Sequence, residues 1–154
     1  SLQAQNAKET SRSILNFDND WKFIKEDIAG AETVSFDDSK WRKLDIPHDW
    51  SIEGSFDEKN LTGGAGAFLP SGIAWYRKRF QLPADSAGKK VFLEFEGIRH
   101  GGEFYLNGES IGRSENGVMA FGFDSERSVS CTSRPAGVPR AGSSGFALVC
   151  RVSC

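Results

Sequence analysis

The dipeptide Asn107-Gly108 is the feature of this sequence that most restricts its fold. Both residues tolerate positive φ, so they fit the centre of a tight turn whose twist matches that of paired strands. They stand between Phe104-Tyr105-Leu106 and Glu109-Ser110-Ile111, two runs in which apolar residues alternate with others. Alternation with period two is typical of a strand with one buried face. The sequence therefore predicts a β-hairpin here.

Further strand-like segments surround this hairpin. Residues 91–95 alternate in the same way, and short strands are expected at 14–17 and 21–24 around an Asp-Asn-Asp turn. A short extended piece at 43–47 ends at a proline. The strand expected at 73–82 has apolar residues on one face and arginines on the other: Ala74, Tyr76, Phe80 and Leu82 against Arg77 and Arg79. One helical turn is expected at 35–41, with Ser35 or Asp37 as its N-cap.

Composition agrees with an all-β protein. The 154 residues include 12 Phe, 4 Trp, 2 Tyr and 17 Gly, and no convincing long helix interrupts the strand-like segments. We therefore expect one jelly-roll β-sandwich, with a flexible N-terminus at 1–12, the sandwich at 13–124 and an irregular tail at 125–154. The formal net charge of −2 with mixed signs argues against nucleic acid or an anionic membrane as a partner. Apolar runs stay well below the ~20 residues that span a bilayer.

Both ends of the chain differ from its middle. The opening residues 1–5 are either the stub beside a signal-peptide cleavage site, which small residues such as Ala4 favour, or a disordered terminus or cloning remnant. The first interpretation predicts a periplasmic or secreted protein. After Asp124 the sequence is rich in Ser, Arg, Gly and Pro and lacks periodicity, and 146–152 is either a final buried strand or apolar by accident.

Metal and cofactor motifs are incomplete in this sequence. Residues 18–20 lack the following Gly and Glu of a calcium loop, and the glycine-rich run 63–66 lacks the Lys-Ser/Thr of a phosphate cradle. All cysteines lie in the tail, at a spacing that matches no zinc site: Cys131, Cys150 and Cys154. A disulfide between two of them would need an oxidising compartment. No metal and no cofactor is expected.

Five motifs in a fixed order carry a resemblance to a known enzyme family. In chain order they are Phe36-Asp37-Asp38-Ser39-Lys40-Trp41-Arg42, Ile46-Pro47-His48-Asp49-Trp50-Ser51-Ile52-Glu53-Gly54, Gly72-Ile73-Ala74-Trp75-Tyr76-Arg77-Lys78-Arg79-Phe80, Phe92-Leu93-Glu94-Phe95-Glu96-Gly97, and Tyr105-Leu106-Asn107-Gly108 with Ile111-Gly112. With them, the segment from Leu15 to Asp124 resembles the N-terminal sugar-binding domain of glycoside hydrolase family 2, and in particular β-galactosidases of gut Bacteroidetes.

The resemblance implies a galactose-binding-domain-like jelly roll, followed in the family by an immunoglobulin-like domain and a TIM barrel with two catalytic glutamates beyond residue 154. It implies that this chain is the non-catalytic piece of a retaining enzyme that hydrolyses terminal β-galactosides. Its partners would be carbohydrate, the remaining domains and, in an oligomeric parent, further copies of the enzyme. The tail departs from the family pattern, because the stretch before Arg151-Val152 is too long and unusual in composition. A frameshift or misjoined terminus and a family-specific insertion both explain it.

Candidate site residues follow from the same motifs. A catalytic pair of carboxylates is not expected, since adjacent acids such as Asp37-Asp38 are typical of turns and caps. The motif His48-Asp49-Trp50 has two interpretations. His48 and Asp49 pin a loop by hydrogen bonds while Trp50 fills the core; or, as the resemblance implies, the loop faces the barrel's active site, where Asp49 and Glu53 contact substrate.

Asn116 is the second candidate. The resemblance implies that the loop 112–117 reaches the catalytic pocket with a polar residue, and Asn116 aligns with that position. Its amide can donate to and accept from sugar hydroxyls. The alternative interpretation is an ordinary Asn-Gly turn.

Two other classes of function stay open. A stand-alone carbohydrate-binding module would need an exposed aromatic platform beside polar groups. The four tryptophans are the candidates, and core positions are expected for at least three of them: Trp21, Trp41, Trp50 and Trp75. A structural or interaction sandwich would have no sugar affinity.

Overall fold

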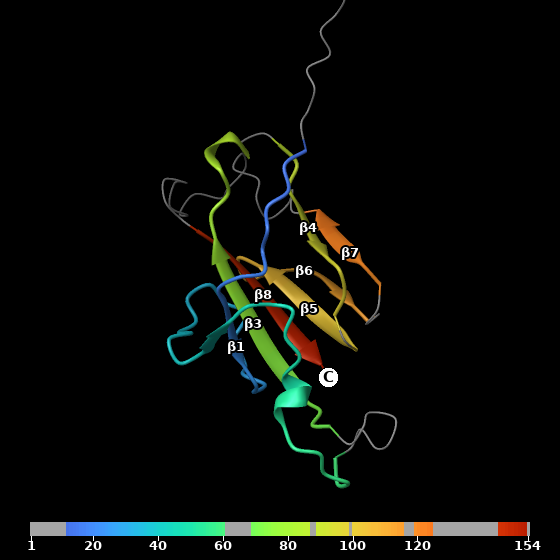
Figure 1. Ribbon diagram of the computed structural model, residues 1–154. Helices are drawn as coiled ribbons and strands as arrows, with labels where there is room; N and C mark the ends of the chain where they lie inside the picture. Colours follow the sequence, from blue (N-terminus) through green and yellow to red (C-terminus); the bar gives the residue numbers. More distant parts are fainter. Residues whose placement is uncertain are drawn as a thin grey trace, which may run out of the picture.

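The structure is a computed structural model that describes residues 12–60, 69–86, 89–98, 100–115, 119–124 and 145–153. Strands and two single 3-10 turns make up its regular structure (Figure 1). The strands are β1 (Trp21–Ile24), β2 (Arg42–Leu44), β3 (Ile73–Phe80), β4 (Phe92–Phe95), β5 (Gly101–Leu106), β6 (Glu109–Ser114), β7 (Phe121–Asp124) and β8 (Phe146–Ser153); the 3-10 turns are η1 (Trp50–Glu53) and η3 (Ala84–Ser86). The prediction of an all-β fold is confirmed.

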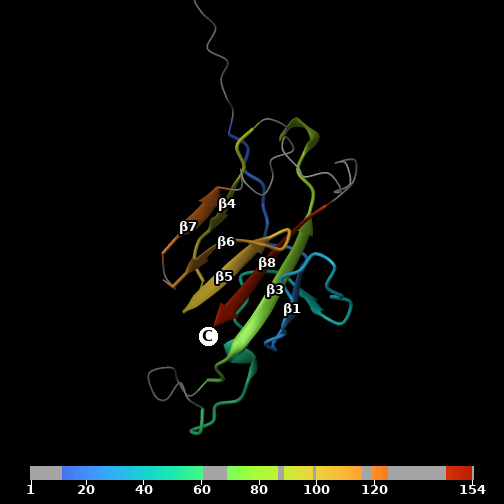
Figure 2. The same cartoon turned by 180° about the vertical axis from the view of Figure 1, so that it is seen from behind.

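The strands form two antiparallel sheets. The large sheet has the order β2-β1-β3-β8-β5-β6, and β4 pairs with β7 in a small sheet. β8 lies between β3 and β5 and pairs with both along its length, from Ile73↔Ser153 to Phe80↔Phe146 on one side. Figure 2 shows β3 and β8 side by side from behind as well. The apolar run near the C-terminus is therefore a central strand.

A cluster of aromatic rings fills the space between the two sheets. Phe104 of the large sheet is fully buried, and its ring centroid lies 4.7 Å from that of Phe95 and 5.1 Å from that of Phe123 in the small sheet. Stacked rings of Phe95 and Phe121, 5.2 Å apart, continue this layer. Such offset and tilted pairs stabilise a core beyond the area that they bury. The contacts make the fold a sandwich, as predicted.

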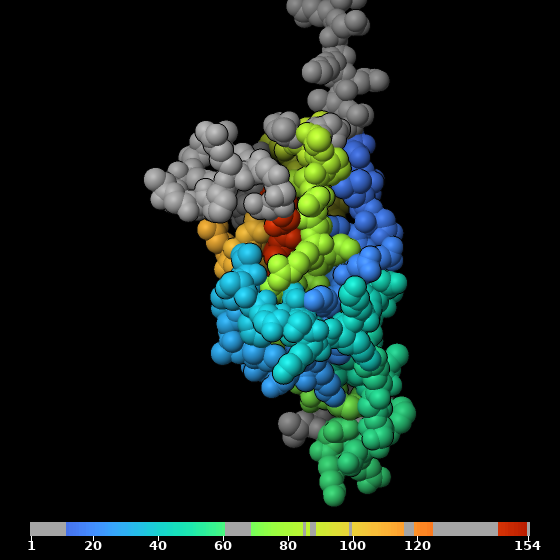
Figure 3. All heavy atoms as spheres, turned by 90° about the vertical axis from the view of Figure 1, so that its left-hand side faces the viewer, coloured from blue at the N-terminus to red at the C-terminus, as the bar shows by residue number. Residues whose placement is uncertain are grey.

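The outer face of the large sheet is covered by the segment 25–41. This segment runs as successive turns, and its Ala31 and Trp41 are buried against Trp75 and Val149 of the sheet. Figure 3 shows the segment, in light blue, lying over the strands. Both faces of the central strands are therefore buried, and Arg77, placed by its alternation opposite the apolar face, is only 1% exposed.

Several sequence expectations agree with these strands. The Asn107-Gly108 hairpin is confirmed as β5–β6, with both residues at positive φ. Ala74, Tyr76 and Phe80 face the inter-sheet core, as expected for one face of the strand at 73–82. All four tryptophans are at most 5% exposed.

Two expectations were wrong. Residues 14–17 form no strand; instead Phe17 packs edge-on against Trp21 and Phe80. Residues 35–41 form no helical turn. A tight turn at 38–41 takes its place, in which the Trp41 backbone N–H donates to the Asp38 carbonyl at 3.1 Å. Asp37 accepts from the Ser39 N–H at 2.9 Å, which makes it a turn residue and not a helix cap.

Within the described residues there is no helix with the length and apolarity needed to span a bilayer.

Candidate functional site

The loop that follows β2 carries the strongest site candidates. It passes through the cis Ile46–Pro47 peptide and enters η1, whose N-cap is Asp49. One carboxylate oxygen of Asp49 accepts from the Ser51 N–H at 3.0 Å and from the Ser51 hydroxyl at 2.5 Å. A carboxylate at this position satisfies N–H groups that the short helix leaves free. The Asp49 side chain therefore favours the start of η1 at this position in the sequence.

Trp50 anchors the loop in the core. Its side chain is 1% exposed and belongs to the inter-sheet cluster, while the Lys25 ammonium lies 4.3 Å above its ring. Among the residues that the structure describes, none accepts a hydrogen bond from the indole N–H of Trp50. The buried area of this ring holds the loop against the sandwich at the end where β3 begins.

His48 is the centre of a hydrogen-bond network that joins the loop to three strands. Its Nδ1 lies 2.9 Å from the Tyr76 hydroxyl of β3, and its Nε2 lies 3.0 Å from Glu53 Oε1. The imidazole also packs edge-on against Phe23 of β1, and Arg42 of β2 donates to Glu53 at 2.7 Å. Because an ion-paired carboxylate can only accept, we assign the hydrogen to Nε2, so that Nδ1 accepts from Tyr76.

Glu53 is held as an anion by this network. The Arg42 guanidinium, followed by the His48 ring, lowers the pKa of the Glu53 carboxyl below its ordinary value. A carboxyl group with a lowered pKa is a poor general acid, since it carries no proton near neutral pH. The Arg42–Glu53 pair is about half exposed and offers both donors and acceptors at the surface. Its chemistry fits hydrogen bonding to polar groups.

The structure places the predicted site residues as follows. Asp49 and Glu53 lie at the two ends of η1, with the Asp49 carboxylate turned to Ser51 and the Glu53 carboxylate turned to His48 and Arg42. Asn116 lies outside the described residues. Hydrogen bonding by His48 and Asp49 and burial of Trp50 agree with the loop-pinning interpretation. Contact of Asp49, Glu53 and Asn116 with substrate stays a prediction.

Sequence reasoning missed Arg42 and Tyr76 as members of this network. Both occur in the family motifs. Arg42 lies in β2 and Tyr76 in β3, whereas His48 lies in the loop, so neither spacing nor local pattern relates the two residues to His48. Only the pairing of β2, β1 and β3 brings them together.

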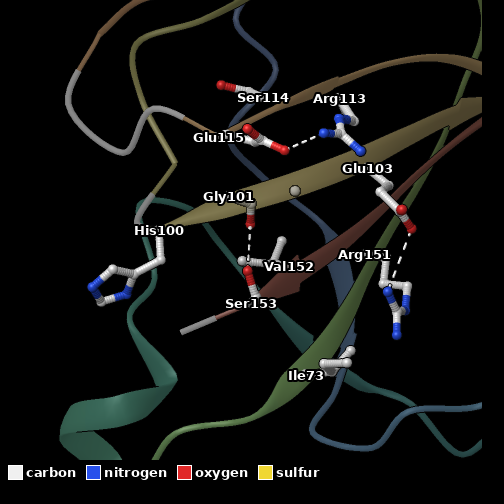
Figure 4. A pocket seen from close by; sticks show the side chains of 11 residues that line it. Ile73, His100, Gly101, Glu103, Arg113, Ser114, Glu115, Arg151, Val152 and Ser153 are labelled. Carbon is white, nitrogen blue, oxygen red and sulfur yellow. Dashed lines mark hydrogen bonds and ion pairs between the residues drawn. The ribbon is translucent and has the colours of Figure 1, made fainter. Parts of the chain in front are cut away.

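A small pocket lies at the end of the sandwich where β3 begins. It encloses about 180 Å³ between the start of β5 and the ends of β6 and β8, and Figure 4 shows its charged residues in pairs. Arg151 lies 3.4 Å from Glu103 and 2.8 Å from Asp27, and Arg113 pairs with Glu115. Each arginine therefore has a carboxylate partner. Among the described residues, no cluster of three or more His, Cys, Asp or Glu side chains could hold a metal ion.

Comparison with known proteins shows that this chain is similar to enzymes that cleave glycosidic bonds. A β-galactosidase of Bacteroides ovatus is 41% identical over 113 residues, which are 73% of this chain and 13% of that protein. A β-glucuronidase of Formosa agariphila is 38% identical over 116 residues, or 75% of this chain and 12% of that protein. A solved family 2 glycosyl hydrolase of Bacteroides cellulosilyticus superposes with a TM-score of 0.76 at 32% identity, over 90% of this chain and 17% of its own. The chain is homologous to the N-terminal sugar-binding domain of family 2 glycoside hydrolases.

The likeness to solved glycosidases extends through the described sandwich. A β-glycosidase of Bacteroides vulgatus superposes with a TM-score of 0.73 at 36% identity and covers 89% of this chain. That coverage exceeds the 73% reached in sequence by the Bacteroides ovatus relative. The chain spans about an eighth of the length of these curated relatives. No protein-family model matches it.

Proposed function

We propose that this chain is the non-catalytic N-terminal domain of a family 2 β-galactosidase, whose two catalytic glutamates lie in a barrel outside it. The observation that carries the proposal is the 41% identity to the Bacteroides ovatus β-galactosidase over 73% of this chain but only 13% of that enzyme. β-Glucuronidase is the second candidate activity of the parent, because a relative with that name is 38% identical over a similar length.

The carboxyl groups of the chain support a non-catalytic role. Retaining hydrolysis needs two carboxylates about 5–5.5 Å apart, one of them with a raised pKa so that it can protonate the leaving group. Four described carboxyl groups have a pKa below its ordinary value: Asp27, Asp37, Asp38 and Glu53. These groups are suited to ion pairs and turns.

The loop 48–53 is the part of this domain that would meet substrate in the parent. The half-exposed Arg42–Glu53 pair presents guanidinium donors and carboxylate acceptors, held in place by His48 and the buried Tyr76. Sugar hydroxyls are both donors and acceptors, so such a pair suits them. Asp49 would shape this loop, and Asn116 would approach substrate from the loop that follows β6.

A stand-alone carbohydrate-binding module is less well supported. The four tryptophans, which are the candidate platforms for a stacked sugar ring, are all in the core. We also propose that the parent works in the periplasm or outside the cell. Carbohydrate, the remaining domains of the parent and further copies of it are the proposed partners.

The first test is enzymatic. The purified chain is incubated with a chromogenic β-galactoside and, in parallel, with the matching β-glucuronide. We expect no hydrolysis of either above the rate in buffer, and turnover that survives further purification would overturn the non-catalytic role.

Calorimetric titration with galactose or lactose is expected to show no binding tighter than millimolar; a micromolar Kd would support the binding-module alternative.

The second test concerns the parent itself. Genomic DNA downstream of the codon for Asp124 is translated in all frames. We expect a reading frame that encodes an immunoglobulin-like domain and a barrel with two glutamates. Their absence from every frame would contradict the proposal. Expression of that longer gene then decides between the β-galactoside and the β-glucuronide.

A further inference from the structure

β8 lies in a slot between two strands that do not pair with each other. It pairs with β3 from Phe146 to Ser153 and with β5 from Leu148 to Ser153. Figures 1 and 2 both show β8, in red, between these two strands. Neither neighbour is joined to β8 by a hairpin, because β7 and residues 125–144 precede it in the chain. Contacts within the slot therefore hold β8 in place.

Apolar side chains enter the core on both faces of β8. Leu148, Cys150 and Val152 belong to the cluster between the sheets, and Val149 belongs to the cluster beneath the segment 25–41. Burial of this kind stabilises any apolar strand in the slot. It fixes the register weakly, because a shift by one residue only exchanges one apolar face for the other. Polar contacts are therefore needed to fix the register of β8.

Arg151, the one charged residue of β8, makes the first of these polar contacts. Its Nη2 and Nε lie 2.8 Å and 3.0 Å from the two carboxylate oxygens of Asp27, and its Nη1 lies 3.4 Å from Glu103. Paired hydrogen bonds between a guanidinium and a carboxylate are directional as well as strong. A shift of β8 by one residue would turn this guanidinium into the apolar cluster between the sheets, where burial of an unpaired charge is costly.

Asn107 makes the second polar contact, near the other end of β8. Its backbone N–H donates to the Ala147 carbonyl at 2.9 Å, and its Oδ1 accepts from the Ala147 N–H at 3.0 Å. Asn107 follows the last residue of β5 and has a positive φ, so its side chain supplies an acceptor where the strand has ended. Ala147 and Arg151 are thus both fixed, and one register satisfies the two contacts together.

We infer that the slot between β3 and β5 is a binding site for an extended strand, that Arg151 sets the register of its occupant, and that β8 of a second copy of this chain can occupy it. A second copy offers identical side chains and therefore identical contacts. In the intact molecule the chain's own β8 has the advantage, because its covalent connection keeps it at a high effective concentration. Cutting that connection removes the advantage. The inference does not depend on the proposed function.

Cleavage of the folded chain tests the slot. A protease recognition sequence is inserted between Gly142 and Ser143, ahead of β8, and the purified protein is cut there under reducing conditions. We expect the two pieces to elute together in size-exclusion chromatography. Unlabelled and isotope-labelled batches of the cut protein are then mixed in urea below the unfolding midpoint and returned to buffer. We expect native mass spectrometry to find complexes of pieces from different copies in the statistical proportion.

Variants of the cut protein test the contact that sets the register. Arg151→Gln is compared with Arg12→Gln, a matched control because Arg12 also bonds both carboxylate oxygens of one acid, Glu94 on β4 in the small sheet. We expect Arg151→Gln to speed the exchange about tenfold or more, as loss of a charge-assisted pair does. The exposed Arg12 pair should change the rate by less than about twofold. Adding Asp27→Asn to Arg151→Gln should give no further acceleration, since both substitutions break the same pair.

The outcomes decide each part of the inference. Pieces that separate as soon as the chain is cut, with loss of the near-ultraviolet circular dichroism signal, would overturn the strand-binding site. Pieces that stay together but never exchange between copies would overturn occupation by a second copy. Equal exchange rates for Arg151→Gln and Arg12→Gln would overturn the role of Arg151. Each variant is cut only after circular dichroism shows native packing, which excludes misfolding as the cause.

Discussion

At the scale of single residues, Asp49 and Glu53 perform different tasks although both are acids in one short motif. Asp49 directs a carboxylate oxygen at Ser51 and begins η1, whereas Glu53 ends η1 and closes the network of His48 and Arg42. The first contact is local along the chain, and the second joins elements that pair only in the folded sheet. Substitutions at the two positions should therefore differ in kind.

Replacing Asp49 by alanine removes the N-cap of η1. We expect a loss of about 1 kcal/mol in the free energy of unfolding, which is typical for a capping side chain. Asp49→Asn keeps a carbonyl oxygen for the Ser51 N–H and should recover most of that loss. Urea unfolding of the chain, followed by tryptophan fluorescence, measures both. Equal destabilisation by alanine and asparagine would show that the cap is not what Asp49 contributes.

The site could be predicted from the sequence only where its contacts are local. The sequence led to the interpretation that Asp49 pins its loop by hydrogen bonds and that Trp50 fills the core, but its cap candidates were Ser35 and Asp37, and the N-cap role of Asp49 emerged from the structure. The Tyr76 hydroxyl that fixes His48 comes from another strand, and no local signal indicates it. Long-range pairing of strands decides such contacts, so they had to await the structure.

At the scale of elements, the segment 25–41 is held to the outer face of the sheet by one buried acid. Asp38 is 7% exposed; it accepts from the Lys22 ammonium at 2.6 Å and from Arg79 at 3.2 Å, and it lies 3.6 Å from the Arg77 Nε. Arg77 in turn donates to the carbonyls of Ala31 and Thr33 in the covering segment. Asp38 is the nearest negative charge to a buried guanidinium.

Asp38→Asn should destabilise the chain strongly. Removing one partner of a buried pair leaves the other charge uncompensated and typically costs about 3–5 kcal/mol. Asp37→Asn is the matched control: it changes the neighbouring, exposed acid and should cost under about 1 kcal/mol, as most surface substitutions do. Guanidinium chloride unfolding of the two variants makes the comparison. Similar losses for both would contradict the importance of the buried pair.

The same residue should make stability depend on acidity. Burial acts to raise the pKa of Asp38, but hydrogen bonds and charges of Lys22 and Arg79 more than offset it, so the pKa is lowered in the folded chain. Its stabilisation is therefore fully present above the unfolded value of about 3.9 and is lost as the pH falls through the folded value. The difference in unfolding free energy between wild type and Asp38→Asn should stay constant from about pH 7 to 5 and shrink below about 4. A constant difference down to about pH 2 would contradict the ion-pair account.

At the scale of the whole molecule, β8 determines whether there is one large sheet or two separate groups of strands. It is buried on both faces, and its Cys150 is 4% exposed. Burial raises the pKa of the Cys150 thiol, so the reactive thiolate is suppressed in the folded chain. Release of this thiol requires β8 to leave the centre of the sheet.

Thiol labelling can report that event. In a chain with Cys131→Ser and Cys154→Ser, we expect Ellman's reagent to leave Cys150 unmodified in native buffer and to label it fully in concentrated guanidinium chloride. The native labelling rate should be lower by a factor of about 10³ or more, because only the rare unfolded molecules react. Labelling at the same rate in both solvents would place β8 outside the core.

Much of this architecture could be predicted from short-range patterns. The Asn107-Gly108 turn, the alternation in β3 and β4 and the aromatic content indicate a sandwich, and the structure confirms it. The run 14–17 misled because Phe17 is apolar for packing on Trp21 and not for strand pairing. The run 146–152 was ambiguous because a strand buried on both faces loses its alternation, and the position of β8 between β3 and β5 is the reason.

The central position of the last strand also has a consequence for biosynthesis. A ribosome releases the chain from its N-terminus at about 5–20 residues per second. Until β8 emerges, the β1–β3 and β5–β6 groups each carry an unpaired hydrogen-bonding edge, at β3 and at β5. Such edges recruit strands from other chains, so the nascent protein is most prone to aggregate just before synthesis of this segment. The large sheet can close only after β8 has been synthesised. A chaperone that protects the edges of β3 and β5 must therefore stay bound until β8 has paired with both strands.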